Sequence, residues 1–565
     1  MKEPRVLVLG GYGVFGRRAC DLLLRRNVVV VVAGRSLEKA EALCADLRAA
    51  FPNARLEPAA ADVDATTLPH WLRALEVQVV IHAAGPFQAQ DYRVAEACIA
   101  AGCHYVDLAD GADFVAGIGA LDAAARAAGV TLVSGASTVP ALTSAILADM
   151  AQRHGRPLRT VAVWLSPGNR TPRGIAVVRA ILGYAGRPIA GFEAGRPRQR
   201  TGWGGLHRFA IGASLPDALG RRWFSDVEMP DALLLPRLFP TLRTARFRAG
   251  LELPLLHLGL WVLALPVRWG LVRSLEPIAR PLWWIAERLI GFGSDRGGMT
   301  VRATLGDPPE AIETEWTIVA EAGSGPTIPA VPAVVMALRL LQRIEPPGAR
   351  PCLAMLPLPD FEAAIAHLPI TITETAEPRR PLFERAIDGL VPGGFAGLPP
   401  VVRTMHLTTR RMSARGRYHA QRPASLGARL AAWATGFPPT AADAPLTVTF
   451  EALDDGSEVW TRDFAGHVMR SRLRIARSPG HVEEQFGRLT GTIRVETSAG
   501  GLRMVPVRLR LGPLPLPRWL TPRIDAREWV AEGRFRFSVA IAMPLLGPCV
   551  RYEGWLAAPT PEPDP

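Results

Sequence analysis

The sequence predicts an α/β protein that begins with a doubly wound parallel sheet, continues with an α+β domain and ends with a mostly antiparallel β domain. Three observations support this prediction. A glycine-rich turn joins an apolar run to a helical pattern near residue 10, and six apolar runs alternate with helical patterns up to about residue 150. Beyond about residue 400 apolar and polar residues alternate, which is typical of half-buried antiparallel strands. At 565 residues the chain is too long for one core.

The glycine-rich turn directly follows the apolar run 6–9 and precedes the helical pattern 17–26. We expect Gly11 to permit the tight turn, Gly13 to let the backbone approach phosphates, and Gly16 to let the helix pack on the strand. The unpaired N–H groups of the helix would then face a dinucleotide pyrophosphate. This is the Rossmann arrangement, and it predicts the following cofactor-binding residues: Gly11, Tyr12, Gly13, Val14, Phe15 and Gly16.

The end of the second apolar run, 28–33, indicates which dinucleotide is bound. NAD-selective folds place an acidic residue there, but this chain has Gly34, Arg35 and Ser36. Arg35 can form a bidentate contact with a 2′-phosphate, and the Ser36 hydroxyl adds a donor. We therefore predict NADP (NADPH) as the cofactor. The alternative is a surface arginine followed by an ordinary helix N-cap.

Four further apolar runs complete the predicted parallel sheet, and helices are expected between the strands. Ligands of such sheets bind at the carboxyl ends of the strands. Asp62 and Val63 follow the third run and are expected to contact the adenine. The loop after the fourth run is expected to cover the nicotinamide ribose, although each of these segments can also be an ordinary turn. The apolar runs are 55–61, 77–82, 104–108 and 130–134. The helices are expected at 36–50, 89–101, 115–128 and 140–154. The loop after the fourth run consists of Ala83, Ala84, Gly85 and Pro86.

Several side chains near the predicted nicotinamide end are candidates for proton transfer. They are expected at strand ends on the ligand-binding edge, where an enzyme that binds NADPH needs orientation, charge stabilisation and one proton donor. Each also has a structural interpretation as a buried strand residue or a turn former, so the sequence selects no catalytic residue. The candidates are His82, His104, Tyr105, Asp107 and Asp110.

The composition excludes several mechanisms and partners. Lysine occurs only at Lys2 and Lys39, which leaves no Tyr-x-x-x-Lys pair, no phosphate-binding Gly-Lys-Ser/Thr loop and no Schiff-base lysine. The six cysteines show no metal-ligand spacing, so no metal site is expected. The net charge of +13 comes from scattered arginines, so we expect no nucleic-acid partner. The first strand begins within five residues of Met1, and we expect a cytoplasmic protein.

Four segments together resemble the NADP-binding domain of saccharopine-dehydrogenase-like oxidoreductases. They are the glycine-rich turn, the Gly34-Arg35-Ser36 turn, the Ala84–Phe87 loop and the Gly102–Leu108 strand. The stretch 298–368 is similar to the second part of that family. This resemblance covers about residues 1–375. It implies a Rossmann NADP-binding domain at 1–150 and a substrate domain on a mixed sheet at 151–375, with the active site between them. It does not imply saccharopine as the substrate.

An apolar helical insertion is expected at about 245–295 within the substrate domain. The run 253–267 is apolar on all sides but too short to cross a bilayer, which takes about 20 helical residues. Tryptophans and arginines accompany it, which favours peripheral contact of 250–290 with anionic lipid, on the inner face of the cytoplasmic membrane. The alternative is a pair of helices buried at a domain or dimer interface. The oligomeric state stays open, with a homodimer as one alternative.

A linker is expected at 376–400, followed by a β-rich domain at 401–560. Alternating patterns at 446–451 and 535–541, with further runs near 457–464, 468–475 and 505–511, predict an antiparallel sheet. Pieces such as Trp460-x-Arg462-x-Phe464 resemble an uncharacterised bacterial domain of unknown function that often follows saccharopine-dehydrogenase-like proteins. The aromatic residues of the sheet either fill a core or hold an apolar ligand.

Three functions are compatible with these features. The first is an NADPH-dependent oxidoreductase that reduces a C=C, C=O or C=N bond of a small-molecule or lipid substrate at a membrane surface. The second is a soluble oxidoreductase with an amino-acid-derived substrate, whose carboxylate Arg173 or Arg200 would bind. The third is a non-catalytic protein that senses NADP or binds lipid.

Overall fold

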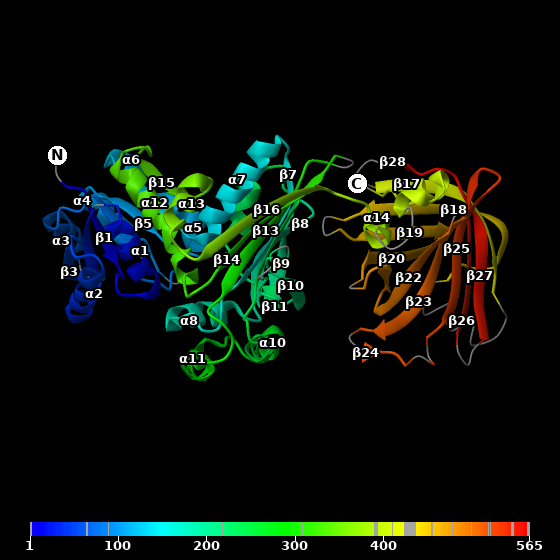
Figure 1. The fold of residues 1–565 in the computed structure, drawn as a ribbon, viewed down its shortest axis with the longest axis horizontal. Coiled ribbons are helices and arrows are strands. Elements are labelled where there is room, and N and C mark those ends of the chain that lie inside the picture. The colour runs from blue at the N-terminus through cyan, green and yellow to red at the C-terminus, as the bar shows by residue number, and fades with distance from the viewer. Residues whose placement is uncertain are drawn as a thin grey trace. The chain divides into compact units, whose positions relative to one another are not determined.

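The computed structural model describes residues 3–561 except 27, 64–65, 89, 214, 216–217, 308–309, 389–393, 409–410, 423–436, 454–455, 477, 499, 513, 518, 520 and 544–546 (Figure 1). The chain divides into two compact units. The first comprises residues 1–306 and 312–377, and the second comprises residues 307–311 and 378–565.

The first unit begins with the predicted parallel sheet. All six predicted strands are present, and their carboxyl ends meet at one edge. A seventh strand, β15, joins β6 from much later in the chain, so the sheet is not confined to residues 1–150. In spatial order the strands are β15 (Gly348–Pro351), β6 (Thr131–Ser134), β5 (His104–Asp107), β4 (Val79–His82), β1 (Arg5–Leu9), β2 (Val29–Gly34) and β3 (Leu56–Ala60).

Helices cover both faces of this sheet. Val6 and Val8 of β1 lie in the core that contains α1 and α12, whereas Leu7 and Leu9 lie in a separate core with α3 and α4. This alternation follows from the period of two residues in a strand, and it makes the sheet doubly wound. The helices are α1 (Val14–Leu24), α2 (Leu37–Ala50), α3 (Leu68–Ala74), α4 (Arg93–Ala101), α5 (Ala112–Gly117), α6 (Asp122–Ala127) and α12 (Ala330–Leu341). Beside them α7 (Thr143–His154) packs on α13 (Leu358–Ile365).

The second sheet of this unit is mixed. Its central strand, β7, pairs in parallel with β12 and antiparallel with β13. The strand order is β10-β11-β12-β7-β13-β14-β16, and the β8–β9 hairpin pairs with β12. The strands are β7 (Leu158–Ser166), β8 (Pro188–Glu193), β9 (Arg196–Thr201), β10 (His207–Ala210), β11 (Arg221–Asp226), β12 (Thr244–Ala249), β13 (Gly297–Leu305), β14 (Ile312–Ala320) and β16 (Ile370–Pro378).

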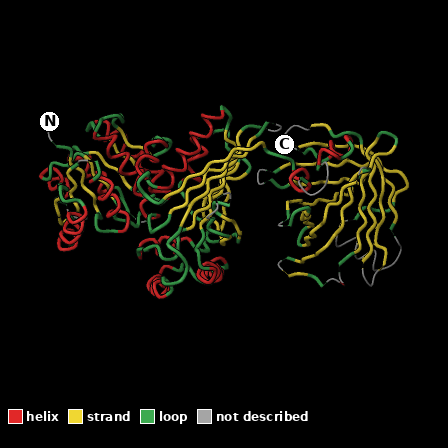
Figure 2. Tube along the Cα trace, in the orientation of Figure 1, coloured by secondary structure: helices red, strands yellow, loops and turns green. Residues whose placement is uncertain are grey.

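Helix α7 packs on β13 of the second sheet, and three further helices gather at the opposite end of that sheet (Figures 1 and 2). They are α8 (Ile175–Tyr184), α10 (Pro254–Arg268) and α11 (Ala279–Arg288), while α9 (Asp231–Leu238) packs on β8 and β12. The expected insertion at 245–295 therefore starts later than predicted, because 244–249 forms β12. In the described residues, no helix has both the length and the apolar character that crossing a bilayer requires.

The second unit is a closed antiparallel β-barrel. Ten strands form the ring, and pairing of β17 with β18 closes it. Two short strands, β24 (Leu514–Pro515) and β28 (Thr560–Pro561), extend β23 and β17. The ring strands are β18 (Ala441–Ala452), β19 (Glu458–Phe464), β20 (His467–Ile475), β21 (His481–Phe486), β22 (Leu489–Ser498), β23 (Gly501–Leu511), β25 (Arg523–Ala531), β26 (Arg534–Met543), β27 (Gly547–Leu556) and β17 (Arg411–Gln421).

The described part of segment 376–400 is not a free linker. It contains α14 (Leu382–Ile387) and a short 3-10 turn, and α15 (Pro400–Met405) follows. Leu382 and Phe383 are buried in the same core as the barrel strands. The prolines that suggested a linker instead precede short helices, where a missing N–H costs nothing.

Candidate NADP site and an adjoining apolar cavity

The glycine-rich turn forms at the carboxyl end of β1. Gly10, rather than Gly11, adopts the left-handed conformation of the turn, with φ +80°. Gly11 instead packs on β2, because a Cβ at this position would lie 2.8 Å from Val32 Cγ1. A Cβ at Gly16 would collide with the backbone of Gly10, so the expected close helix packing at Gly16 holds.

The N-terminus of α1 is suited to bind phosphate. Its N-cap, Gly13, is exposed and makes no side-chain cap hydrogen bond, and the first turn contains no acidic residue. The backbone N–H groups of the first turn, including those of Val14 and Phe15, therefore have no side-chain acceptor at the cap. A Cβ at Gly13 would meet only the Gly10 carbonyl oxygen, at 3.0 Å, so its outer side is open.

Tyr12 connects this turn to the predicted 2′-phosphate loop. Its hydroxyl oxygen accepts a hydrogen bond from the Ser36 backbone N–H at 3.1 Å, and Ser36 Oγ caps α2 by accepting from the Lys39 N–H. Arg35 is exposed and makes no hydrogen bond or ion pair with any described residue. The Arg35 guanidinium is thus free to bind an anion beside the glycine turn, which fits NADP.

The loop after β4 lies against the same turn. A Cβ at Gly10 would lie 3.0 Å from backbone atoms of Ala83 and Ala84, and Gln90 Nε2 donates to the carbonyl oxygens of Ala84 and Pro86 at 2.8 and 2.9 Å. Gly85 and Pro86 are exposed at this edge.

Asp62 and Val63 follow β3 at the carboxyl edge of the same sheet, where the Ala61 N–H donates to the Gly34 carbonyl oxygen. Asp62 is exposed and Val63 is half-buried. Binding of NADP by these residues stays a prediction.

The candidates for proton transfer are mostly occupied inside the protein. His82 Nδ1 and the Tyr105 hydroxyl form a buried hydrogen bond of 3.0 Å, and burial lowers the pKa of His82 to about 4. Burial raises the pKa of Asp107 to about 6, although its Oδ1 accepts N–H bonds from Ala109 and Gly135. Asp110 is exposed and accepts from Gln88 Nε2.

His104 was expected at the ligand-binding edge, and this expectation is wrong. It is the first residue of β5, so it lies at the opposite edge, where its Nδ1 accepts from the Thr131 N–H at 3.0 Å. The direction of a parallel strand decides which of its ends faces the ligand, and residue type carries no such information.

An apolar cavity of about 360 Å³ lies in the barrel, and a larger one of about 580 Å³ lies in the first unit. The larger cavity is enclosed mainly by aliphatic side chains of α8, α10 and α11 and by the ends of β7 and β13. Phe15 of α1 and Thr138, four residues beyond β6, also line it. Because Phe15 follows the Gly13 cap by two residues, this cavity adjoins the predicted cofactor site.

Polar groups on the wall of this larger cavity are few. The Thr138 side chain is buried and makes no hydrogen bond within the described residues. Arg173 bonds Asn169 Oδ1 at 3.0 Å and has Glu287 3.8 Å away. Arg200, the other predicted carboxylate ligand, does not line this cavity and is neutralised by ion pairs with Glu193 and Asp226.

None of the five proton-transfer candidates lines this cavity. The sequence reasoning missed Thr138, although the signal for it was available. It follows a predicted strand by four residues, at the ligand-binding edge, and Ser137 and Thr138 are polar residues between apolar ones.

The fold and the open N-terminus of α1 define an NADP-binding oxidoreductase fold of the doubly wound class. Comparison with protein families identifies the two ends of the chain. Residues 6–133 match the saccharopine dehydrogenase NADP binding domain, and residues 398–556 match a domain of unknown function, DUF4166. The resemblance of 298–368 to the second part of the saccharopine dehydrogenase family lies outside both matches and stays a prediction.

Solved structures are similar at low identity. The L-Glu-forming saccharopine dehydrogenase of Saccharomyces cerevisiae is 15% identical over 66% of this chain and 100% of its own, with a TM-score of 0.45. An amine dehydrogenase from Mycobacterium smegmatis is 13% identical over 63% of this chain and 96% of its own, with a TM-score of 0.34. No curated protein matches the chain.

Proposed function

We propose that this protein is an NADPH-dependent oxidoreductase that reduces a lipid-like substrate taken from the surface of an anionic membrane. The observation that carries the proposal is the extent of the 580 Å³ cavity. Its wall runs from Phe15, beside the glycine turn, to Leu255, Leu263 and Ile285, which are exposed on the outer surface. An apolar chain could thus enter from outside and reach the cofactor edge without crossing water.

The outer surface around this entrance is apolar. Ten of the twenty large apolar side chains that the described residues expose lie between 255 and 292. Trp269, Leu271 and Trp284 are 66%, 74% and 54% exposed. Exposed apolar side chains concentrated in this way mark a contact surface. We call residues 255–292 the apolar patch.

The apolar patch also contains exposed arginines. Arg268, Arg273, Arg280 and Arg288 are exposed, and none forms an ion pair with a described residue. The Arg288 guanidinium lies over the Trp284 ring, 4.5 Å from its centroid. Tryptophan, aliphatic side chains and free arginines together suit the headgroup region of an anionic bilayer.

The residues near the cofactor edge have distinct roles in the proposed reaction. Bound NADPH would supply a hydride to a C=C, C=O or C=N bond, and solvent would supply the proton that completes the reduction. The N–H groups at the start of α1 and Arg35 would hold the phosphates. The Thr138 hydroxyl would bind the polar end of the reacting bond, since it is a cavity-lining group with no hydrogen-bond partner in the described structure.

Deuterium transfer tests the proposal. Protein is incubated with NADPH deuterated at C4, in either configuration, and with vesicles made from a membrane lipid extract. We expect deuterium in a lipid product, and no product with a Gly13→Val variant. Binding of NADPH without deuterium transfer to any lipid would favour the non-catalytic sensor. Transfer to a water-soluble amino-acid derivative would favour the second function, for which Arg173 on the cavity wall is the supporting observation.

A further inference from the structure

The C-terminal barrel is hollow. Its ten-stranded ring is continuous, because β17 pairs with both β27 and β18. The cavity inside measures about 360 Å³, within the roughly 300–1,000 Å³ typical of small-molecule sites. Protein interiors are normally packed without such spaces, so an empty volume of this size in a closed barrel indicates a ligand.

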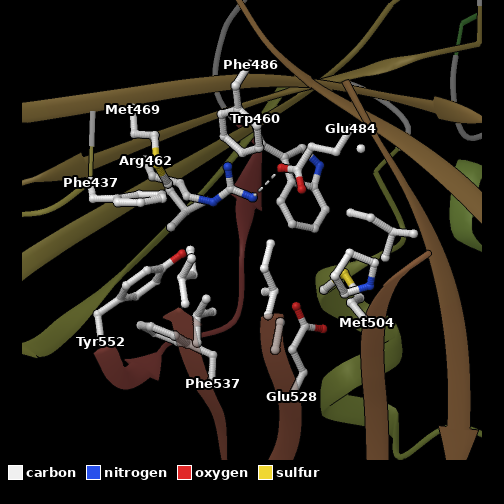
Figure 3. Close-up of a pocket in the computed structure, with 18 of the residues that line it drawn as sticks. Phe437, Trp460, Arg462, Met469, Glu484, Phe486, Met504, Glu528, Phe537 and Tyr552 are labelled. Atoms are coloured by element: carbon white, nitrogen blue, oxygen red, sulfur yellow. Dashed lines mark hydrogen bonds and ion pairs between the residues drawn. The ribbon is translucent and has the colours of Figure 1, made fainter. Parts of the chain in front are cut away.

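Apolar side chains form most of the cavity wall. Phe437, Trp460, Phe486 and Phe537 surround it, together with the flexible side chains of Met469 and Met504 (Figure 3). Methionine and aromatic side chains adapt to irregular hydrocarbon shapes. The wall therefore suits a hydrocarbon chain.

Each charged side chain of the wall has a partner within the barrel, and Arg527 pairs with Asp525 at 2.8 Å. The Arg462 guanidinium donates to Glu484 Oε1 at 3.1 Å (Figure 3). Ser471 Oγ accepts from the arginine at 2.9 Å and donates to the same carboxylate at 2.7 Å. Glu528 is paired with His406 Nε2 at 2.6 Å. The cavity therefore offers no uncompensated positive charge to an anionic headgroup.

One hydroxyl on the wall lacks a partner. The Tyr552 side chain reaches into the cavity, as Figure 3 shows, and the residue is only 7% exposed. Its hydroxyl makes no hydrogen bond with any described residue. A hydroxyl with no protein partner is available to a polar atom of a ligand. Burial also raises the pKa of Tyr552 to about 12, which keeps the hydroxyl protonated.

The barrel mouth near β23 and β24 is apolar as well. Leu509 and Leu516 line the cavity, and the Leu516 N–H bonds the Leu509 carbonyl. Next to them Leu511 and Leu514 are exposed. Cavity-lining and exposed leucines thus follow one another along β23 and β24.

We propose that the barrel binds a neutral, single-chain lipid such as a long-chain alcohol, aldehyde or ester. The hydrocarbon chain lies against the aromatic and methionine wall, and the polar end bonds the Tyr552 hydroxyl beside the Arg462–Glu484 pair. This site belongs to the second unit alone, so the proposal does not depend on the reaction proposed for the first.

Gly491 provides the main test. It lines the cavity, and a Cβ there would have its nearest neighbours at 3.7–4.0 Å, which is ordinary contact. A Cβ at residue 491 therefore meets no collision, and the rest of a leucine side chain would extend into the cavity. We expect calorimetric titration of the full chain with dodecanol to show binding at the barrel that Gly491→Leu removes, with an unchanged or raised melting temperature. The matched control is Thr492→Leu, one residue along β22 and not on the cavity wall.

Two further measurements test whether the polar end of the ligand is neutral and bonds the Tyr552 hydroxyl. Tyr552→Phe should weaken dodecanol binding roughly two- to tenfold without lowering the melting temperature, because it removes one hydrogen bond to the ligand. Dodecanoate, ionised at about pH 8, should bind more weakly than dodecanol. Tighter binding of dodecanoate, or no effect of Tyr552→Phe, would overturn the neutral headgroup. Equal dodecanol binding by wild type and Gly491→Leu would overturn the site itself, while deuterium transfer in the first unit would be unaffected.

Discussion

The hydroxyl oxygen of Tyr12 accepts a hydrogen bond from the backbone N–H of Ser36, and the Tyr12 ring covers Gly34 so closely that a Cβ there would lie 2.5 Å from it. Two loops that are separate in the sequence are thereby held together, one suited to the pyrophosphate and the other to the 2′-phosphate. Arg35 lies between Gly34 and Ser36, so this contact positions the arginine that would distinguish NADP from NAD.

Arg35→Ala should reduce affinity for NADPH roughly tenfold to a hundredfold, since a charge-assisted contact to the 2′-phosphate is lost. Affinity for NADH should stay unchanged. Fluorescence titration with both cofactors measures the two affinities, and Arg26→Ala, an exposed arginine at the far end of α1, is the control. Equal losses for NADPH and NADH would show that Arg35 does not read the 2′-phosphate.

Gly13→Val should abolish binding of both NADPH and NADH. Its side chain would occupy the open space in front of the α1 N-terminus, where the pyrophosphate is expected. Circular dichroism should show an intact fold. Gly119→Val is the control, because a Cβ at Gly119 faces open space away from this turn. Retained NADPH binding by Gly13→Val would place the pyrophosphate elsewhere.

Asp231→Asn should stabilise the protein at about pH 8. The carboxyl is fully buried, and burial raises its pKa to about 7 from the ordinary value of 3.8, although Thr143 Oγ1 donates to it. Between these values the folded state binds more protons than the unfolded state, so stability falls as pH rises from about 4 to about 7 and then levels. The variant should lose that slope and gain up to about 4 kcal/mol above pH 7.

Chemical denaturation at several pH values measures this effect. Asp360→Asn, an exposed carboxyl on α13, serves as the control and should keep the wild-type slope. A variant with the same pH dependence as wild type would mean that Asp231 ionises in the folded state as it does in the unfolded chain.

Replacement of Trp269, Leu271 and Trp284 by serine should weaken binding to anionic vesicles roughly tenfold or more, because the exposed apolar area is lost. Co-sedimentation with phosphatidylglycerol vesicles measures binding, which should also fall with salt as the arginine contacts are screened. Ile344→Ser, an exposed apolar residue outside the apolar patch, should have no effect. Equal sedimentation of the triple variant and wild type would exclude the patch as the membrane contact.

Much of the first domain could be predicted from the sequence. The six strands of the parallel sheet follow from buried apolar runs, and the glycine turn follows from residues whose Cβ atoms would collide. The structure differs from the prediction at one position of the turn, because Gly10 rather than Gly11 has the positive φ that the turn requires. Adjacent glycines are equivalent in a sequence, and only the path of the chain distinguishes them.

Other features depend on contacts between distant segments. Strand β15 joins the first sheet from residue 348, and residues 382–387 pack into the barrel core rather than forming a linker. Local patterns carry no information about such long-range pairing. His104 is a different case, because it opens the predicted run 104–108 and the sequence alone therefore places it at the amino end of its strand.

The sequence by itself determined the cofactor-binding architecture, because a glycine turn, a strand and a helix form from neighbouring residues and local sterics select them. Tertiary structure alone decided where empty space remains. Alternating apolar residues in β17–β27 predict a sheet with one buried face, but whether that face is filled depends on how the ring closes. The same holds for the larger cavity, whose wall joins Phe15 to Leu263 across about 250 residues of chain.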